Sequence, residues 1–283
     1  MSSSSIKGAA APSPDFQALR LEAESLVRLP DRPFRLSPEE SRLLFLDTRQ
    51  LRAKSASFDG REVRGVVAPQ AVVTDIESLL RRFGDWARAT VVDLAPRYVD
   101  ALEAGRASLR LRDAADAPLS ARKDDRRLHV DAFASQPTGG RRILRVFANI
   151  NPWGEPRLWR VAEPFEVHAR RFLPRLRDLW PGESQILNAL GLTRGRRTRY
   201  DALMLGLHDA AKGDLDYQRE ANATDIAFAA GESWVVFTDS AVHAALKGRF
   251  ALEQTFYLPV EAMAAPGAAP LRVLERLTGR MLS

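Results

Sequence analysis

The stretch Leu128-His129-Val130-Asp131-Ala132-Phe133 decides the fold when it is combined with Trp234-Val235-Val236-Phe237-Thr238, which leads to His243. Side chains in a strand alternate between two faces, so a strand over the first stretch places His129 and Asp131 on one side, within reach of one metal ion. A second strand then has to bring His243 to the same ion. Two imidazoles and one carboxylate leave three positions of an octahedron open, which is the ligand arrangement of non-haem Fe(II) oxygenases. A His-x-Asp pair alone also occurs by chance on protein surfaces, so its surroundings matter.

Segments with strong β-forming character surround these candidate ligands. A turn over residues 136–140 precedes the strand predicted over Arg142–Asn151, which ends at Pro152. A turn over residues 230–233 precedes the strand predicted over residues 234–238. A short alternating strand is predicted over residues 108–112, just before the His-x-Asp segment.

Composition limits the chemistry available to this chain. It has 283 residues, 45% of them hydrophobic, with four histidines and no cysteine. This length supports an ample core, and the absence of cysteine excludes disulfides, thiolate metal sites and cysteine nucleophiles. The net charge of +6 and the pI near 10 indicate an anionic partner, whether nucleic acid, an acidic membrane surface or a phosphorylated substrate.

The chain divides into three regions by its sequence pattern. We expect a disordered Ser-, Ala- and Pro-rich tail over residues 1–15, a mostly helical support region over 16–105, and a β-rich catalytic region over 106–283. Helices are predicted over 15–27, from the N-cap Ser37, and over 74–104. A basic helical insertion over about 165–191 is either a lid or an ordinary solvated helix.

The order of these segments resembles the double-stranded β-helix of the Fe(II)/2-oxoglutarate-dependent oxygenases. The resemblance implies an α+β fold with a jelly-roll oxygenase core and flanking N-terminal helices. A more specific resemblance, to the Kdo hydroxylases, rests on four phrases: residues 129–133, 145–152, 200–209 and 253–256. It implies an enzyme that uses Fe(II), 2-oxoglutarate and O2 to hydroxylate carbon 3 of 3-deoxy-D-manno-oct-2-ulosonic acid (Kdo) in lipid A-linked inner-core lipopolysaccharide.

The same resemblance implies an anionic Kdo-containing glycolipid as the partner and no nucleic acid. No apolar stretch approaches the length of a membrane span, and residues 1–5 lack an apolar signal core. We therefore expect a cytoplasmic protein, with peripheral contact at the cytoplasmic face of the inner membrane. The dense run Arg194–Arg199 favours anion binding at such a surface.

The far carboxylate of a metal-bound 2-oxoglutarate needs a cation, and arginine fits it through two parallel hydrogen bonds. Arg145 is the first choice, because it shares a strand face with Phe147. Arg110 is the second, although an outward, solvated position is open to it. Arg249 is the third, because it follows His243 by only six residues and lies in a turn.

Three further residues have candidate roles. His208 is expected to contact substrate or to cap a buried strand, and His168 to be an ordinary surface histidine. Asp239 is expected to accept a hydrogen bond from a metal-bound histidine or to cap a turn.

Other functions stay open from the sequence alone. One is an oxygenase of the same fold that acts on a protein side chain or a nucleic-acid base. Others are a cupin-like metal enzyme without 2-oxoglutarate and a nonenzymatic basic protein that binds nucleic acid, for which charge is the only support. Iron-dependent formation of succinate from 2-oxoglutarate distinguishes the oxygenases from the last two.

Overall fold

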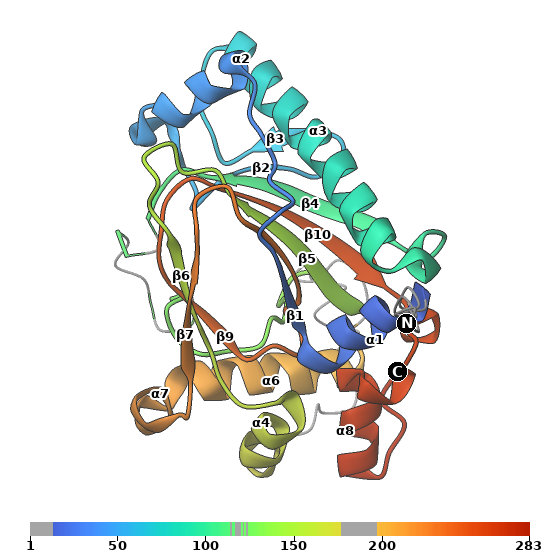
Figure 1. The fold of residues 1–283 in the computed structure, drawn as a ribbon. Coiled ribbons are helices and arrows are strands. Elements are labelled where there is room, and N and C mark those ends of the chain that lie inside the picture. Colours follow the sequence, from blue (N-terminus) through green and yellow to red (C-terminus); the bar gives the residue numbers. More distant parts are fainter. Residues whose placement is uncertain (1–13, 114, 117–119, 121, 123, 177–196) are drawn as a thin grey trace, which may run out of the picture.

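Two antiparallel sheets form the centre of the molecule (Figure 1). The computed structural model describes residues 14–283 except 114, 117–119, 121, 123 and 177–196. The larger sheet has seven strands in the order β1-β8-β5-β10-β4-β2-β3, and the smaller has three in the order β7-β6-β9. Every pair of neighbouring strands is antiparallel. This is the double-stranded β-helix that the sequence predicts.

The strand predictions around the candidate ligands are confirmed with small shifts. The run predicted over 142–151 forms β5 (Arg142–Asn149), and that over 234–238 forms β8 (Ser233–Phe237). The alternating segment at 108–112 is the end of the longer strand β4 (Glu103–Arg110). The remaining strands are β1 (Leu26–Leu29), β2 (Ala56–Phe58), β3 (Val63–Arg64), β6 (Arg157–Val161), β7 (Thr224–Phe228), β9 (His243–Lys247) and β10 (Ala251–Leu258).

An aromatic cluster fills the space between the two sheets. Phe147 and Trp234 of the larger sheet stack at a ring-centroid distance of 5.1 Å, and Phe228 of the smaller sheet stacks on Trp234 at 3.9 Å. Trp159 of β6 meets Phe147 edge-on at 5.0 Å. All four side chains are almost fully buried, so they hold the sheets together from both sides.

The N-terminal region is helical but also supplies strands. Helices α1 (Pro14–Glu24), α2 (Pro38–Ser41) and α3 (Gln70–Leu94) form there, and the tail over residues 1–13 lies outside the described residues. The first helix ends before Val27, where the prediction had placed its end, because Ser25 adopts a positive φ of 60° and the chain turns into β1. Strands β1, β2 and β3 join the large sheet, and the boundary expected after residue 105 falls within β4.

Helices cover the barrel in two places. The apolar stripe of α3, including Ile76, Leu79 and Phe83, packs with Leu109 and Leu252 of the large sheet. Helices α4 (Phe165–Phe172), α6 (Arg199–Gly213), α7 (Leu215–Glu220) and α8 (Pro270–Thr278) gather at the other end of the barrel (Figure 1).

The expected insertion over 165–191 is only partly described, because residues 177–191 lie outside the described part. Its histidine, His168 on α4, is fully buried against Phe172 and Tyr217, so the prediction of a surface histidine is wrong. Within the described residues, no helix is both long and apolar enough to cross a bilayer.

Candidate metal centre

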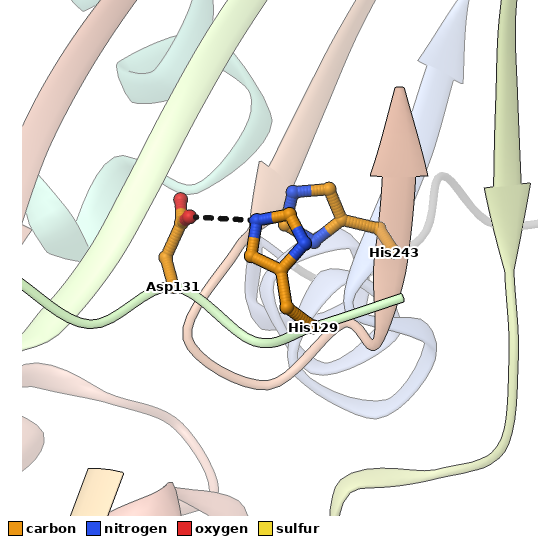
Figure 2. Close-up of side chains that lie close together, drawn as sticks. All are labelled: His129, Asp131 and His243. Atoms are coloured by element: carbon orange, nitrogen blue, oxygen red, sulfur yellow. Dashed lines mark ion pairs between the residues drawn. The ribbon is translucent and has the colours of Figure 1, made fainter. Parts of the chain in front are cut away.

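His129, Asp131 and His243 come together inside the barrel (Figure 2). One potential ligand atom from each of the three lies within 4.8 Å of the others. His129 Nε2 and Asp131 Oδ1 lie 3.5 Å apart. The two imidazole rings are 4.7 Å apart between centroids. One divalent ion can therefore reach all three side chains.

The backbone fixes the relative positions of these residues. The N–H of His129 donates to the carbonyl of His243 at 3.0 Å, and the N–H of His243 donates back to that of His129 at 2.9 Å. The N–H of Asp131 donates to the carbonyl of Thr238 at 2.7 Å. Within the described residues, the bridge between His129 and His243 is the one β-pairing of the His-x-Asp segment. The prediction of a regular strand there is therefore wrong, although the two side chains do share a face.

Hydrogen bonds also set the tautomer of each histidine. The Nδ1 atoms of His129 and His243 lie 2.7 Å and 2.8 Å from the carbonyls of Arg127 and Ala241. Because a carbonyl only accepts, each Nδ1 carries the proton and each Nε2 keeps its lone pair for a metal. Asp239 does not accept a hydrogen bond from either histidine. It forms a buried ion pair with Arg142 at 2.7 Å, so the prediction that it contacts a metal-bound histidine is wrong.

The charges around the triad favour metal-binding protonation states. Burial raises the pKa of Asp131, but the charge of the neighbouring Arg145 outweighs it and holds that pKa well below its usual range. Burial and the neighbouring His129 lower the pKa of His243 to about 4. Asp131 Oδ2 is buried with no hydrogen bond among the described residues, although Arg145 Nη2 lies 3.0 Å away. An anionic oxygen and two imidazole nitrogens fit a ferrous ion.

A cavity of about 290 Å3 opens on the triad. Its walls include Phe133, Phe147 and Trp159, whose ring stacks on His243 at 4.9 Å. The cationic side chains along it are Arg110, Arg122, Arg145, Arg157 and Lys212, and the carboxylates are Asp125 and Asp131. Glu253 and Asp209 pair with three of these cations, so five cations face four carboxylates, and the cavity keeps a net positive charge that suits an anionic ligand.

Two of the three arginines predicted to bind 2-oxoglutarate line the cavity, and the third does not. Arg145 lines the cavity, and its Nη1 lies 2.6 Å from Glu253 Oε1. Arg110 also lines it and pairs with the other oxygen of Glu253 at 2.7 Å, so it is not an outward, solvated residue. Arg249 does not line it: its Nε donates to the carbonyl of Leu111, and its guanidinium lies over the ring of Phe250.

Arg157, at the start of β6, is a cavity residue that the sequence reasoning missed. Its side chain is almost fully buried, and Nη1 donates to the carbonyl of Gly248 at 2.8 Å. Its Nε has no hydrogen-bond partner, and none of the described carboxylates forms an ion pair with it. Burial lowers its pKa to about 10. Gly248 permits this close packing, because a Cβ there would lie 2.9 Å from the Cα of Arg157.

His208 lies on α6 at the edge of the same cavity. Its ring meets that of His129 edge-on at 5.2 Å, and its Nδ1 lies 3.0 Å from Asp209. It lies outside the group of three potential ligands, so a substrate contact remains its predicted role.

Comparisons with known proteins agree with this geometry. Residues 9–281 match the family model described as 3-deoxy-D-manno-oct-2-ulosonic acid (Kdo) hydroxylase. Three similar crystal structures are of the Kdo hydroxylase KdoO, a non-haem Fe(II) α-ketoglutarate-dependent dioxygenase: one apo, one with α-ketoglutarate and Fe(III), and one with succinate and Fe(III).

Each of these structures is 41% identical to the present chain, over 96% of this chain and 93% of the other, with TM-scores of 0.90, 0.90 and 0.89. A comparison with curated proteins gave no match. The family contradicts the nonenzymatic alternative and the metal enzyme without 2-oxoglutarate. The chain belongs to the Kdo hydroxylases, which are Fe(II)/2-oxoglutarate-dependent dioxygenases.

Proposed function

We propose that this enzyme adds a hydroxyl group to carbon 3 of Kdo in lipid A-linked inner-core lipopolysaccharide. The observation that carries the proposal is the His129, Asp131 and His243 triad at one end of a cationic cavity. The sugar itself supports carbon 3. In a 3-deoxy sugar acid, the ring carbon 3 bears no oxygen, whereas a second oxygen on an alcohol carbon yields a carbonyl rather than a stable hydroxyl.

His129, Asp131 and His243 are proposed as the complete set of protein ligands to iron. Bound ferrous iron, with 2-oxoglutarate and O2, supplies the oxidising chemistry that inserts oxygen into a C–H bond while 2-oxoglutarate becomes succinate and CO2. The protein holds each imidazole through its Nδ1 hydrogen bond and holds Asp131 through Arg145. These contacts keep the three donor atoms directed at one point.

Arg157 is proposed as the principal partner of the far carboxylate of 2-oxoglutarate. Arg145 and Arg110, the first and second choices from the sequence, both form ion pairs with Glu253. Arg157 has no such partner among the described carboxylates and keeps an unpaired Nε beside the cavity. A buried cation without an anion is costly, and a ligand carboxylate removes that cost. Arg145 and Arg110 complete the positive wall next to it.

The net charge of the protein and its family support the proposed glycolipid acceptor and the proposed place of action. The net charge of +6 favours an anionic acceptor and an anionic membrane surface. In the expected basic run, Arg197 and Arg199 are described, and Arg197 donates to the carbonyl of Ala134 near the His-x-Asp segment. We propose that the enzyme works at the cytoplasmic face of the inner membrane, before the glycolipid is exported.

The test is a reconstituted reaction with Fe(II), 2-oxoglutarate, O2 and a Kdo glycoside. We expect succinate and a Kdo product heavier by one oxygen, with the new hydroxyl located at carbon 3 by NMR. The His243→Ala protein serves as the inactive control. A product oxidised at another carbon, or succinate without any oxidised sugar, would refute the assignment.

A further inference from the structure

A second hollow shares no lining residue with the metal cavity and has no role in the reaction described so far. It encloses about 560 Å3, and Tyr257 of β10 contributes its aromatic ring to the wall. We call it the Tyr257 groove; its charged side chains are Asp59, Arg61, Glu62, Arg64, Glu103, Arg106 and Arg141. Its size is within the range of ligand-binding pockets.

The strand register places this groove next to the iron site. Glu253, Thr255 and Tyr257 project from one face of β10, because side chains alternate along a strand. Arg145 is paired directly with Thr255 and contacts Glu253 on one side, so Tyr257 flanks it on the other. One face of β10 therefore runs from the metal cavity into the groove.

The loop after Asp131 makes the same connection. Phe133 lines the metal cavity, where the guanidinium of Arg145 lies 5.5 Å from its ring centre. Gln136, three residues later, lines the Tyr257 groove. The same loop therefore borders both hollows, and a ligand that filled both would pass Phe133 and Tyr257.

The charges of the groove are unevenly paired. Arg64 pairs with Glu62 and Asp59, and Arg141 pairs with Glu103. Arg61 and Arg106 form no ion pair with any described residue, and both are exposed. The pairing leaves these two cations for a ligand.

The aromatic ring adds a polar group at the same place. The guanidinium of Arg141 lies 4.9 Å from the centre of the Tyr257 ring, which packs on the backbone of Gly105. The Tyr257 hydroxyl makes no hydrogen bond to the described part of the chain, although only 7% of the residue is exposed. It is therefore available to donate to an acceptor oxygen.

We propose that the Tyr257 groove binds a second anionic group of the acceptor, a carboxylate or phosphate on the sugar next to the Kdo unit that is hydroxylated. Arginine pairs with either group through parallel hydrogen bonds, and the tyrosine hydroxyl donates a further one. The proposal rests on the proposed function. It makes the enzyme selective for an extended acceptor over an isolated Kdo unit.

The test compares three probes: the methyl glycoside of Kdo, a disaccharide of two Kdo units, and a Kdo glycoside of a phosphorylated glucosamine. We expect the double variant Arg61→Gln/Arg106→Gln to raise KM about tenfold for the extended probe that carries the recognised group, with kcat unchanged. KM for the methyl glycoside should not change. The disaccharide tests a second carboxylate and the glucosamine compound tests a phosphate.

The matched control is Arg20→Gln/Arg170→Gln, which removes two exposed arginines elsewhere and should leave all three KM values unchanged. The Tyr257→Phe variant should raise the same KM as the arginine pair. Unchanged KM values for both extended probes, or an equal rise for the methyl glycoside, would overturn the proposal.

Calorimetry separates this proposal from the proposed function. Binding of each probe to the Co(II)- and 2-oxoglutarate-loaded protein without O2 does not depend on turnover. If the wild type hydroxylates none of the probes, the proposed function fails. Weaker binding of an extended probe to the Arg61→Gln/Arg106→Gln protein alone still supports the groove, and equal binding to both proteins refutes it.

Discussion

Replacement of Arg157 by Met tests whether an unpaired buried cation is kept for a ligand. Met retains most of the aliphatic length of arginine and removes the charge. Loss of a buried, hydrogen-bonded charge pair costs roughly 2–5 kcal/mol. Taking about 3 kcal/mol, the affinity for 2-oxoglutarate should fall about a hundredfold. Affinity for the metal should change little, because Arg157 forms no hydrogen bond or ion pair with His129, Asp131 or His243.

The same substitution should not destabilise the ligand-free protein. Burial lowers the pKa of Arg157 from 12.5 to about 10, which corresponds to about 3 kcal/mol of unfavourable free energy for the charged form. The lost hydrogen bond to the Gly248 carbonyl offsets about 1 kcal/mol of this. We expect the free energy of unfolding of Arg157→Met to equal or exceed that of the wild type by up to about 2 kcal/mol.

Calorimetric titration of 2-oxoglutarate into Co(II)-loaded, oxygen-free protein measures the affinity, and denaturant unfolding of the metal-free protein measures stability. Arg249→Met is the matched control, because Arg249 does not line the cavity and should leave the affinity unchanged. Wild-type affinity in Arg157→Met would show that another cation holds the carboxylate. A strong loss of stability would show that Arg157 is structural.

Three further predictions concern the metal ligands and the pairs around them. The His243→Ala protein should fold but lose turnover and bind Fe(II) weakly; full activity in the folded variant would contradict the ligand assignment. Asp239→Asn breaks the buried pair with Arg142 and should lower the free energy of unfolding by about 3 kcal/mol, while Fe(II) affinity is retained; denaturant unfolding and metal titration together check this. Burial is the main reason that the pKa of His243 falls from 6.5 to about 4, so the unfolded chain binds a proton at this residue more readily than the folded protein does. The free energy of unfolding of the metal-free protein should therefore fall by about 3 kcal/mol as the pH falls from 6.5 to 4. The loss should be smaller in His243→Gln, and an identical pH slope in both proteins would contradict the assignment.

The sequence pointed to the three side chains that the structure brings together, because these residues carry a local pattern. His129 and Asp131 are two positions apart, and the apolar run before His243 identifies the strand β8 that leads to it. The pattern could not show how the His-x-Asp segment is held. A single backbone bridge and a hydrogen bond to Thr238 replace the regular strand pairing there.

Arg157 was missed because its importance depends on contacts distant in sequence. It precedes Leu158 and Trp159 in a five-residue strand that the sequence analysis did not predict. The available signal was the alternation that puts Arg157 on the same face as Trp159, a large aromatic side chain suited to a core. Whether an arginine beside it finds a carboxylate depends on strands that pack against it, and no local pattern reports that.

Similar reasoning explains the errors at His168 and Asp239. His168 lies in a basic segment, yet Glu163 and Tyr217 surround it once α4 and α7 pack. Asp239 is close to His243 in sequence, but the nearest cation in space is Arg142 of β5. Tyr217 and Arg142 come from elements far from His168 and Asp239 in the sequence.

The reciprocal hydrogen bonds between His129 and His243 have a consequence for how the enzyme acquires iron. These hydrogen bonds join the main chains of the two proposed ligands and need no metal, so we expect both residues to be in position before iron binds. Metal capture then needs little ordering of the backbone, and its affinity is not reduced by a large entropic cost. Amide hydrogen exchange at these two positions should therefore be slow in the metal-free protein and change little when the ion binds.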